Sequence, residues 1–273
     1  AQKREFLRIT QPEIDRILLR EGQPDRGGRG RRRHRDAAIE RPSMAAAVAI
    51  VREGLVGASA LPDDQLMTIA GRLSVEDRTA LLRAYVGARA NRRHKPGRAF
   101  ERTSYRFDVL SDYGAFRDLQ RHRLLTLEWQ PLGPRHGYTE PAAIEEAGAL
   151  GEWREIMDRS AELHDSLVAE GLRDVAPYAV VMAYRIRFYM DMNAREAMHV
   201  IELRTAPQGH PAYRRVCQLM HRAIADEAGH HAIAAAMSYA DHSDVELERL
   251  QSERHLEAKR RQTNPPFDPP FNP

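Results

Sequence analysis

Arginine and histidine residues are grouped at two places along the chain where they could hold an anionic ligand. The first group is the triplet Arg121-His122-Arg123, which follows a short stretch of helical pattern. An arginine presents a planar fork of donors that matches phosphate oxygens in pairs, so two arginines around a histidine could bind a phosphate or a dinucleotide pyrophosphate. The structural alternative is a helix C-terminus, whose cations interact favourably with the helix dipole.

The second group begins at Asn193, whose type and position indicate a helix N-cap directly after a strand. Arg195 and His199 are four residues apart and share one face of that helix, while Arg204 lies at its C-terminal end. A helix start that follows a polar strand face is a suitable wall for an anion. The alternative is that Asn193 only caps the helix and Arg204 only ends it.

Two Glu-x-x-His pairs raise a different possibility, a di-iron site in a helical bundle. The pairs are Glu196 with His199 and Glu227 with His230, and His231 is adjacent to the second pair. The two helices that carry them are joined directly by a short loop, and the further glutamates that such a site needs are not evident. A long alternating strand also does not suit a bundle. We therefore predict no metal site.

The sequence indicates no nucleophile. Cys217 is the only cysteine, and it lies in the middle of a predicted helix beside Val216, where a core position is more typical than a catalytic one. No Gly-rich phosphate loop of the Walker or Rossmann kind is present in the sequence. Covalent catalysis by the chain and dinucleotide binding of the doubly wound type are therefore not expected.

The elements that would position these groups alternate between strand and helix without a regular repeat. Alternation predicts strands over Thr103 to Leu110 and Val180 to Met192, and helical spacing predicts a short helix over Asp112 to Arg121. Further helices are predicted after the Asn193 cap and from Pro211, since proline suits a first helical turn. This order predicts an α+β fold rather than a doubly wound sheet.

Two more helices are predicted away from the charged groups. Ser74 looks like an N-cap, with Asp77 three residues later. Leu150, Trp153 and Met157, together with later apolar residues up to Leu167, fall at helical spacing.

Composition divides the 273 residues into three parts. Residues 1–42 form a basic arm that we expect to be largely disordered, because Gly and Arg in its run 26–35 cannot bury apolar surface. Such a run can bind nucleic acid through phosphates, but a solvated linker is the favoured interpretation. Residues 43–260 form the predicted folded domain, and residues 261–273 a proline-rich tail.

The chain shows no targeting or membrane signal. No apolar run approaches the roughly 18 residues that a membrane helix needs. The polar start at residues 1–5 does not resemble a signal peptide, so we expect a cytoplasmic protein.

Taken together, these residues resemble the flavin-dependent thymidylate synthases (ThyX). The resemblance rests on Phe100-Glu101 followed by Gln120-Arg121-His122-Arg123, then on Asn193-Ala194-Arg195 and Leu203-Arg204 at a matching distance. It covers about residues 94 to 224. It implies an antiparallel sheet packed with helices, a homotetramer with sites between subunits, and conversion of dUMP to dTMP with FAD, NADPH and methylenetetrahydrofolate. Because flavin carries the methylene and the hydride in that family, a cysteine nucleophile is not required.

The resemblance assigns roles to individual positions on the cofactor side. His199 stands where the family commonly has asparagine, and Asp118 stands where it has a glutamine that contacts the nucleotide. The positions that match flavin-binding ones are Arg121, His122, Arg123, Asn193, Arg195 and His199.

On the substrate side, Arg204 matches the catalytic arginine that polarises the uracil ring and favours its ionised form. Thr126 replaces a serine of the family pattern, and Glu128 lies next to the position of a glutamate that touches both ligands. Pro131 and Gly133 replace a serine and an arginine that hold the nucleotide phosphate. Two hypotheses follow: a flavoenzyme acting on a nucleotide-like substrate, and a non-catalytic relative with a structural or regulatory role.

Overall fold

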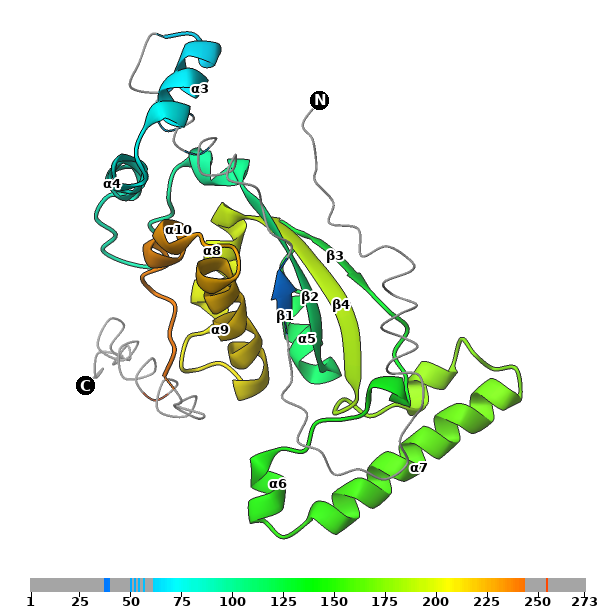
Figure 1. Ribbon diagram of the computed structural model, residues 1–273. Coiled ribbons are helices and arrows are strands. Elements are labelled where there is room, and N and C mark those ends of the chain that lie inside the picture. Colours follow the sequence, from blue (N-terminus) through cyan, green and yellow to red (C-terminus); the bar gives the residue numbers. More distant parts are fainter. Residues whose placement is uncertain are drawn as a thin grey trace, which may run out of the picture.

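The computed structural model describes residues 61–243, the short segment 37–39, and the single positions 50, 52, 54, 56 and 254. The predicted basic arm and proline-rich tail lie almost entirely outside these residues, so the expected disorder of the arm stays a prediction there. Residues 37–39 of the arm are an exception, because they form a strand. In the described part, helices lie against a small sheet, and a separate helical arm extends from one end (Figure 1).

The sheet is antiparallel throughout, with strand order β1-β2-β4-β3. Its long central pair is formed by β2 and β4, which align from Ser104 opposite Asn193 to Asp112 opposite Arg185. The predicted α+β fold with an antiparallel sheet is therefore confirmed. The strand bounds are Ala37–Ile39 for β1, Ser104–Asp112 for β2, Thr126–Trp129 for β3 and Arg185–Asn193 for β4.

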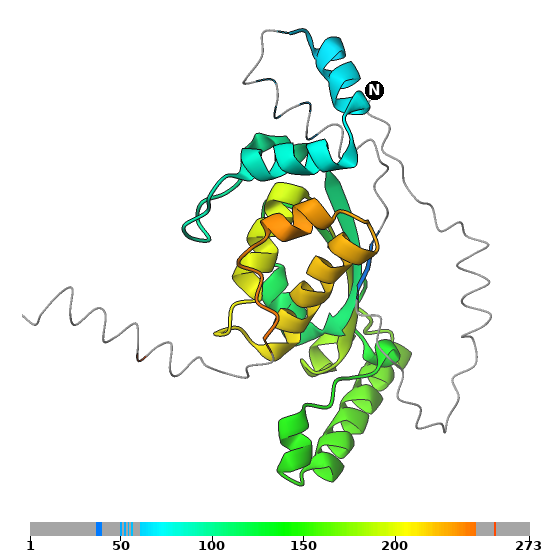
Figure 2. The ribbon, with the colours of Figure 1, turned by 60° about the vertical axis from the view of Figure 1, so that its left-hand side comes forward.

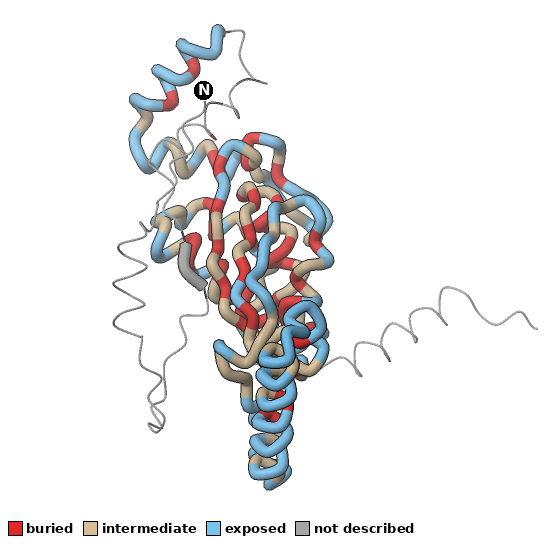
Figure 3. The backbone as a smooth tube through the Cα atoms, turned by 90° about the vertical axis from the view of Figure 1, so that its right-hand side faces the viewer, coloured by how far each residue is buried: buried red, intermediate tan, exposed pale blue. Residues whose placement is uncertain are grey.

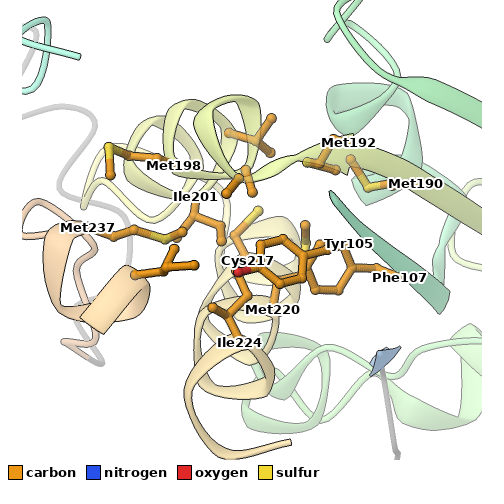
Figure 4. Packing of buried hydrophobic residues seen from close by; sticks show 14 of the residues in the cluster. Tyr105, Phe107, Met190, Met192, Met198, Ile201, Cys217, Met220, Ile224 and Met237 are labelled. Atoms are coloured by element: carbon orange, nitrogen blue, oxygen red, sulfur yellow. The ribbon is translucent and has the colours of Figure 1, made fainter. Parts of the chain in front are cut away.

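One face of the sheet packs into the hydrophobic core. Alternate residues of the two central strands are buried, among them Phe107 and Phe188, because successive side chains of a strand point to opposite faces. The helices that cover this face are α5 (Tyr113–Leu119), α8 (Ala194–Arg204) and α9 (Pro211–Asp226). Figure 4 shows Tyr105 from the sheet beside Cys217 and Met220 from α9, all in one core cluster.

Cys217 is fully buried in this core, as its sequence context predicts. Burial raises the pKa of its thiol to about 12, so the thiolate is strongly disfavoured. Burial and a raised pKa therefore disfavour Cys217 as a nucleophile in the folded chain.

The predicted strand over Val180 to Met192 is correct only in its second half. Strand β4 begins at Arg185, and Met182 is 55% exposed. The carbonyl groups of Met182 and Tyr184 accept hydrogen bonds from Gly114 and Tyr113 at the start of α5. Their backbone therefore anchors α5 rather than extending the sheet, and the short helix η3 (Ala176–Ala179) precedes this turn.

The arm consists of α6 (Ala142–Glu146) and α7 (Leu150–Ala169), and it extends beyond the sheet (Figures 1 and 2). The predicted helix is confirmed as α7. Its residue Met157 is buried against Val180 and Tyr184, which join the arm to the rest of the fold. Ile156 and Leu163, on the same helix, are about half exposed in this chain. Figure 3 shows that most of the arm is exposed.

At the other end, α3 (Asp63–Arg72) and α4 (Val75–Val86) lead to the short helix η1 (Arg98–Arg102). The backbone N–H of Asp77 donates to Ser74 Oγ over 3.0 Å, which confirms the predicted N-cap. The remaining elements are η2 (Pro134–His136) and α10 (His231–Ala236). No helix among the described residues is long and apolar enough to cross a membrane.

Candidate functional site

The turn after α5 directs the middle residue of the Arg-His-Arg triplet inward. Asp112 caps α5 by accepting from Ala115 N, and the N–H of His122 donates to Leu119 O at the end of the helix. The His122 side chain is consequently only 5% exposed, whereas Arg121 and Arg123 are exposed on either side of it. The triplet thus provides one buried imidazole and two cations that face solvent.

Helix α8 supplies the groups that meet this imidazole. Asn193 Oδ1 accepts from Glu196 N over 2.9 Å, which confirms the predicted N-cap. From its position three residues after Asn193, Glu196 suits the second place of a capping box. The box is only half formed in the described contacts, because the buried Glu196 carboxylate faces His122 instead, with Oε1 3.9 Å from Nδ1. His199, one turn further, has its ring edge-on to His122 with ring centroids 5.7 Å apart.

Arg204 is held at the same place by several contacts. Its Nε donates to His122 Nε2 over 2.9 Å, and a terminal nitrogen donates to the carbonyl of Asp118 over 2.7 Å. The carboxylate of Asp118 lies 3.6 Å from the other terminal nitrogen, and the guanidinium lies 5.3 Å from the Tyr213 ring centroid. A side chain that is 16% exposed and bonded on several sides has little freedom to reorient.

The hydrogen bond from Arg204 determines the protonation of His122. A guanidinium can only donate, so His122 Nε2 is the acceptor and the ring proton lies on Nδ1, toward Glu196. Burial, then the positive charge of Arg204, lower the pKa of His122 to about 4. The ring is therefore neutral at pH 7. Burial also raises the pKa of the Glu196 carboxyl.

His199 is also kept neutral, but by different charges. Burial lowers its pKa first, followed by the positive charges of Lys95 and Arg92. Both cations belong to the loop between α4 and η1, which crosses α8 at this point. These cations therefore place positive charge beside His199.

His122, Glu196 and His199 offer ligand atoms within 4.8 Å of one another, the kind of group that could hold a metal ion. Ligands around zinc are closer together, at about 3.3 Å for tetrahedral bonds of the usual length. Binding at His122 Nδ1 would move its proton to Nε2, where it would face the N–H of Arg204. The surrounding charges thus favour an anion over a divalent cation.

The second Glu-x-x-His pair lies elsewhere. His230 Nδ1 is 2.8 Å from the hydroxyl of Tyr105, and neither Glu227 nor His231 joins the candidate ligand group among the described residues. In the residues that the structure describes, both pairs belong to a fold whose core is built on a sheet, whereas a di-iron site of this kind belongs to a four-helix bundle.

Arg195 lies on α8 near the same loop. Its Nε donates to Pro96 O over 3.0 Å, and a terminal nitrogen lies 3.3 Å from the Glu101 carboxylate. Its side chain is 35% exposed, so part of the guanidinium faces solvent. Arg195 both ties the loop to α8 and adds positive charge near Glu196.

The two substrate-side positions on β3 do not join this cluster within one chain. Thr126 is paired with Asp191 and Glu128 with Tyr189, so these side chains point to the sheet face opposite the helices. Both are exposed, whereas Arg204 lies among the helices on the core side. Of the predicted site residues, His122, His199 and Arg204 are therefore brought together, and Thr126 and Glu128 are not.

Sequence reasoning missed a buried ion pair that joins the loop between α4 and η1 to α8. Arg89 donates to both carboxylate oxygens of Glu202 over 2.6 Å, and the two side chains are 4% and 1% exposed. No local pattern could reveal a pair separated by 113 positions. Asp118 was noticed only as a departure from the family pattern, and its contacts with Arg204 carry no sequence signal.

The sequence is similar to a known protein family and to curated proteins from other organisms. The family model described as "Thymidylate synthase complementing protein" matches residues 57–230. A UPF0159 protein from Chlamydia pneumoniae is 39% identical over 182 residues, covering 67% of this chain and 34% of that protein. A UPF0159 protein from Thermoplasma acidophilum is 35% identical over 182 residues, covering 66% of this chain and 36% of that protein. The chain thus spans about a third of the length of these curated relatives.

A solved structure has the same fold. It is the crystal structure of a UMP/dUMP methylase, PolB, from Streptomyces cacaoi bound with 5-Br dUMP, with a TM-score of 0.54 and 21% identity. The similarity covers 73% of this chain and 95% of that one. Together with the family model, which spans more than half of the sequence, these findings establish that the chain belongs to the thymidylate synthase complementing protein family.

Proposed function

We propose that the chain binds FAD and acts on a uridylate-like nucleotide, methylating dUMP to dTMP with methylenetetrahydrofolate and NADPH or carrying out a closely related reaction. The observation that carries the proposal is the fixed guanidinium of Arg204, bonded to the neutral ring of His122 and the carbonyl of Asp118. A rigidly held cation beside an uncharged, buried imidazole is suited to stabilise negative charge on a bound ring.

The residues around α8 fit a flavin nucleotide. Arg121 and Arg123 are exposed, and Arg195 is partly so, which provides donors for pyrophosphate oxygens. Asn193 starts the helix nearby, where backbone N–H groups also favour anions. When bound, the flavin would supply the redox and one-carbon chemistry. The chain then needs no nucleophile of its own, which agrees with the buried, protonated thiol of Cys217.

The chain's own part in the reaction is binding, orientation and electrostatics. Arg204 placed against a uracil ring would lower the pKa of the ring N–H, because a nearby positive charge favours the ionised form. His122 holds Arg204 through Nε2 and stays neutral, so it adds no charge that would compete for the nucleotide. Arg204 is therefore assigned as the catalytic residue of the proposed reaction.

The complete site requires more than one subunit in this proposal. Thr126 and Glu128 lie on the sheet face opposite Arg204, so they can reach the same ligand only from another copy. We therefore infer a homo-oligomer, with a tetramer as the form implied by the family resemblance. A cytoplasmic location, expected from the sequence, belongs to the same proposal.

The test is an activity assay with FAD, NADPH, methylenetetrahydrofolate and dUMP, with dTMP as the measured product. Arg204→Ala should lower the turnover rate about 100- to 1000-fold, the usual effect of removing one electrostatic stabiliser. Arg159→Ala on the exposed arm is the matched control and should leave the rate unchanged. Equal rates for the two variants would contradict the assigned role of Arg204.

A second candidate is a non-catalytic member of the family with a structural or regulatory role. It is favoured by the carboxylate of Asp118, which lies 3.6 Å from Arg204 and partly neutralises the cation that the reaction would use. Asp118→Gln removes that charge and keeps the backbone carbonyl that binds Arg204. If wild type makes no dTMP but still binds FAD, and Asp118→Gln restores turnover, the second candidate is supported.

A further inference from the structure

The loop between α4 and η1, residues 87–97, is built around one buried guanidinium. Arg89 bonds both oxygens of Glu202 on α8 and also donates to the carbonyls of His94 and Arg92, at 2.6 and 3.3 Å. The same side chain donates to Ala236 O over 2.8 Å. A loop whose own carbonyl groups surround a buried ion pair has a fixed shape, because releasing it would leave both charges unpaired.

A second set of contacts fixes the far end of this loop on α8. Arg195 donates to Pro96 O over 3.0 Å, immediately after Lys95. Within the loop, Asn91 Oδ1 accepts from Arg93 N, and His94 accepts at Nδ1 from Ala90 N. The loop is therefore fixed along its length and held against α8 at both Glu202 and Arg195.

The outward cations of this loop differ from the other arginines near the site. Arg98 pairs with Glu101, and Arg204 has Asp118. The side chains of Arg92 and Lys95, by contrast, make no hydrogen bond or ion pair among the residues that the structure describes. The backbone of both residues lies beside α8, because Arg195 of α8 bonds Pro96 O directly after Lys95, and Arg89 joins Arg92 O to Glu202 of α8. Positive charge at Arg92 and Lys95 also lowers the pKa of His199.

We propose that Arg92 and Lys95 bind the phosphate ester of the ligand, above His199 on α8. The inference rests on the proposed function for the identity of that ligand, which is either the pyrophosphate of FAD or the monophosphate of the nucleotide. Both phosphate groups carry several negatively charged oxygens that accept hydrogen bonds. Such oxygens suit the planar fork of an arginine and the compact charge of a lysine. Because the loop is already fixed by Arg89, binding costs little ordering of the backbone.

The neutral state of His199 completes this subsite. A charged imidazole is not needed to attract the anion, because Arg92 and Lys95 already supply positive charge next to it. A neutral ring can still donate one N–H to a phosphate oxygen. In this subsite the cations of the loop would attract the phosphate, and His199 on α8 would donate a hydrogen bond to it.

The experiment compares ligands that differ only in their phosphates, in wild type, Lys95→Gln, Arg92→Gln and the double variant. Calorimetry measures the affinities for FAD against riboflavin and for dUMP against deoxyuridine. The matched control is Arg93→Gln, because Arg93 is exposed on the same loop but does not act on His199 or Glu196. Each test variant should weaken the phosphate-bearing ligand roughly 10- to 100-fold while riboflavin and deoxyuridine are unaffected.

The affected ligand identifies the source. Selective loss of FAD affinity assigns the subsite to the flavin pyrophosphate, and selective loss of dUMP affinity assigns it to the nucleotide. Unchanged affinities in the double variant, with wild type binding both ligands, would overturn the inference and leave the proposed function intact.

Inorganic pyrophosphate separates failure of the inference from failure of the proposed function. We expect pyrophosphate alone to shift the NMR signal of the His199 ring in wild type and in Arg93→Gln, but not in the double variant. If wild type binds neither FAD nor dUMP yet shows this response, the subsite stands and the proposed function fails. If pyrophosphate gives no response in wild type and phosphates add nothing to ligand affinity, the inference is wrong.

Discussion

Replacing Arg89 by alanine is the perturbation whose effect follows most directly from the structure. Arg89 and Glu202 are 4% and 1% exposed, and their guanidinium and carboxylate meet through two bonds of 2.6 Å. The variant removes those bonds and those to three carbonyl groups. It also leaves the Glu202 carboxylate buried, with Tyr239 N at 3.3 Å as its remaining donor among the described residues.

The expected cost follows from the burial. Removing one partner of a buried, hydrogen-bonded ion pair costs about 3–5 kcal/mol, because the other charge is left uncompensated in a low dielectric. An exposed pair of good geometry is worth about 0–1 kcal/mol. Arg154 and Glu140 supply such a pair here, with a bond of 2.7 Å and side chains that are 50% and 38% exposed. The two alanine variants should therefore differ in unfolding free energy by about 2 kcal/mol or more.

The assay is urea unfolding at pH 7, followed by circular dichroism, for wild type, Arg89→Ala and Arg154→Ala. The double variant Arg89→Met/Glu202→Leu removes both buried charges, so it should be more stable than Arg89→Ala. Equal stability of Arg89→Ala and Arg154→Ala would refute the reasoning. A double variant less stable than Arg89→Ala would show that lost packing, rather than the unpaired carboxylate, causes the effect.

Three further results are expected. The pKa of His122 falls from 6.5 to about 4 on folding, so the unfolded chain binds its proton more readily and stability declines as pH falls through that range. His122→Gln should remove about 1–2 kcal/mol of that decline, after allowance for solvent screening, in urea unfolding at pH 7 and pH 5; an unchanged pH dependence would contradict the assignment. Asn193→Ala should lower the unfolding free energy by about 1 kcal/mol through loss of the cap on α8, measured against Ser74→Ala as the equivalent change on α4; no loss at Asn193 would show that the cap contributes nothing. Cys217 should react with a thiol reagent only on unfolding, because its thiol is buried with a raised pKa; rapid labelling of the native chain would show that α9 opens locally.

Local patterns predicted most of the elements that position the site. The alternation that ends at Met192 and the cap at Asn193 predicted a strand followed directly by a helix. This prediction succeeded because both signals depend only on neighbouring residues. The same reasoning failed at Met182, where alternation continues but the carbonyl is used to anchor α5. Whether a backbone group joins a ladder depends on residues distant in sequence, and periodicity carries no information about them.

The candidate site was predicted in its residue types but not in its grouping. The resemblance pointed to His122 and Arg204, and the structure brings them to a 2.9 Å hydrogen bond. Glu196 was considered only as a cap or a metal ligand, and its contact with His122 depends on the turn after α5. The contribution of the loop at Lys95 depends on Arg89 and its distant partner, so it required the fold.

The central claim is that the groups around α8 hold a flavin nucleotide. The most direct test is the visible absorbance spectrum of the purified protein, before and after adding FAD, followed by titration with dUMP. We predict that FAD is retained, that dUMP shifts its spectrum, and that Arg195→Ala weakens retention because a partly exposed cation of α8 is lost. Failure to bind FAD at any concentration would contradict the claim and leave a family member with a structural or regulatory role.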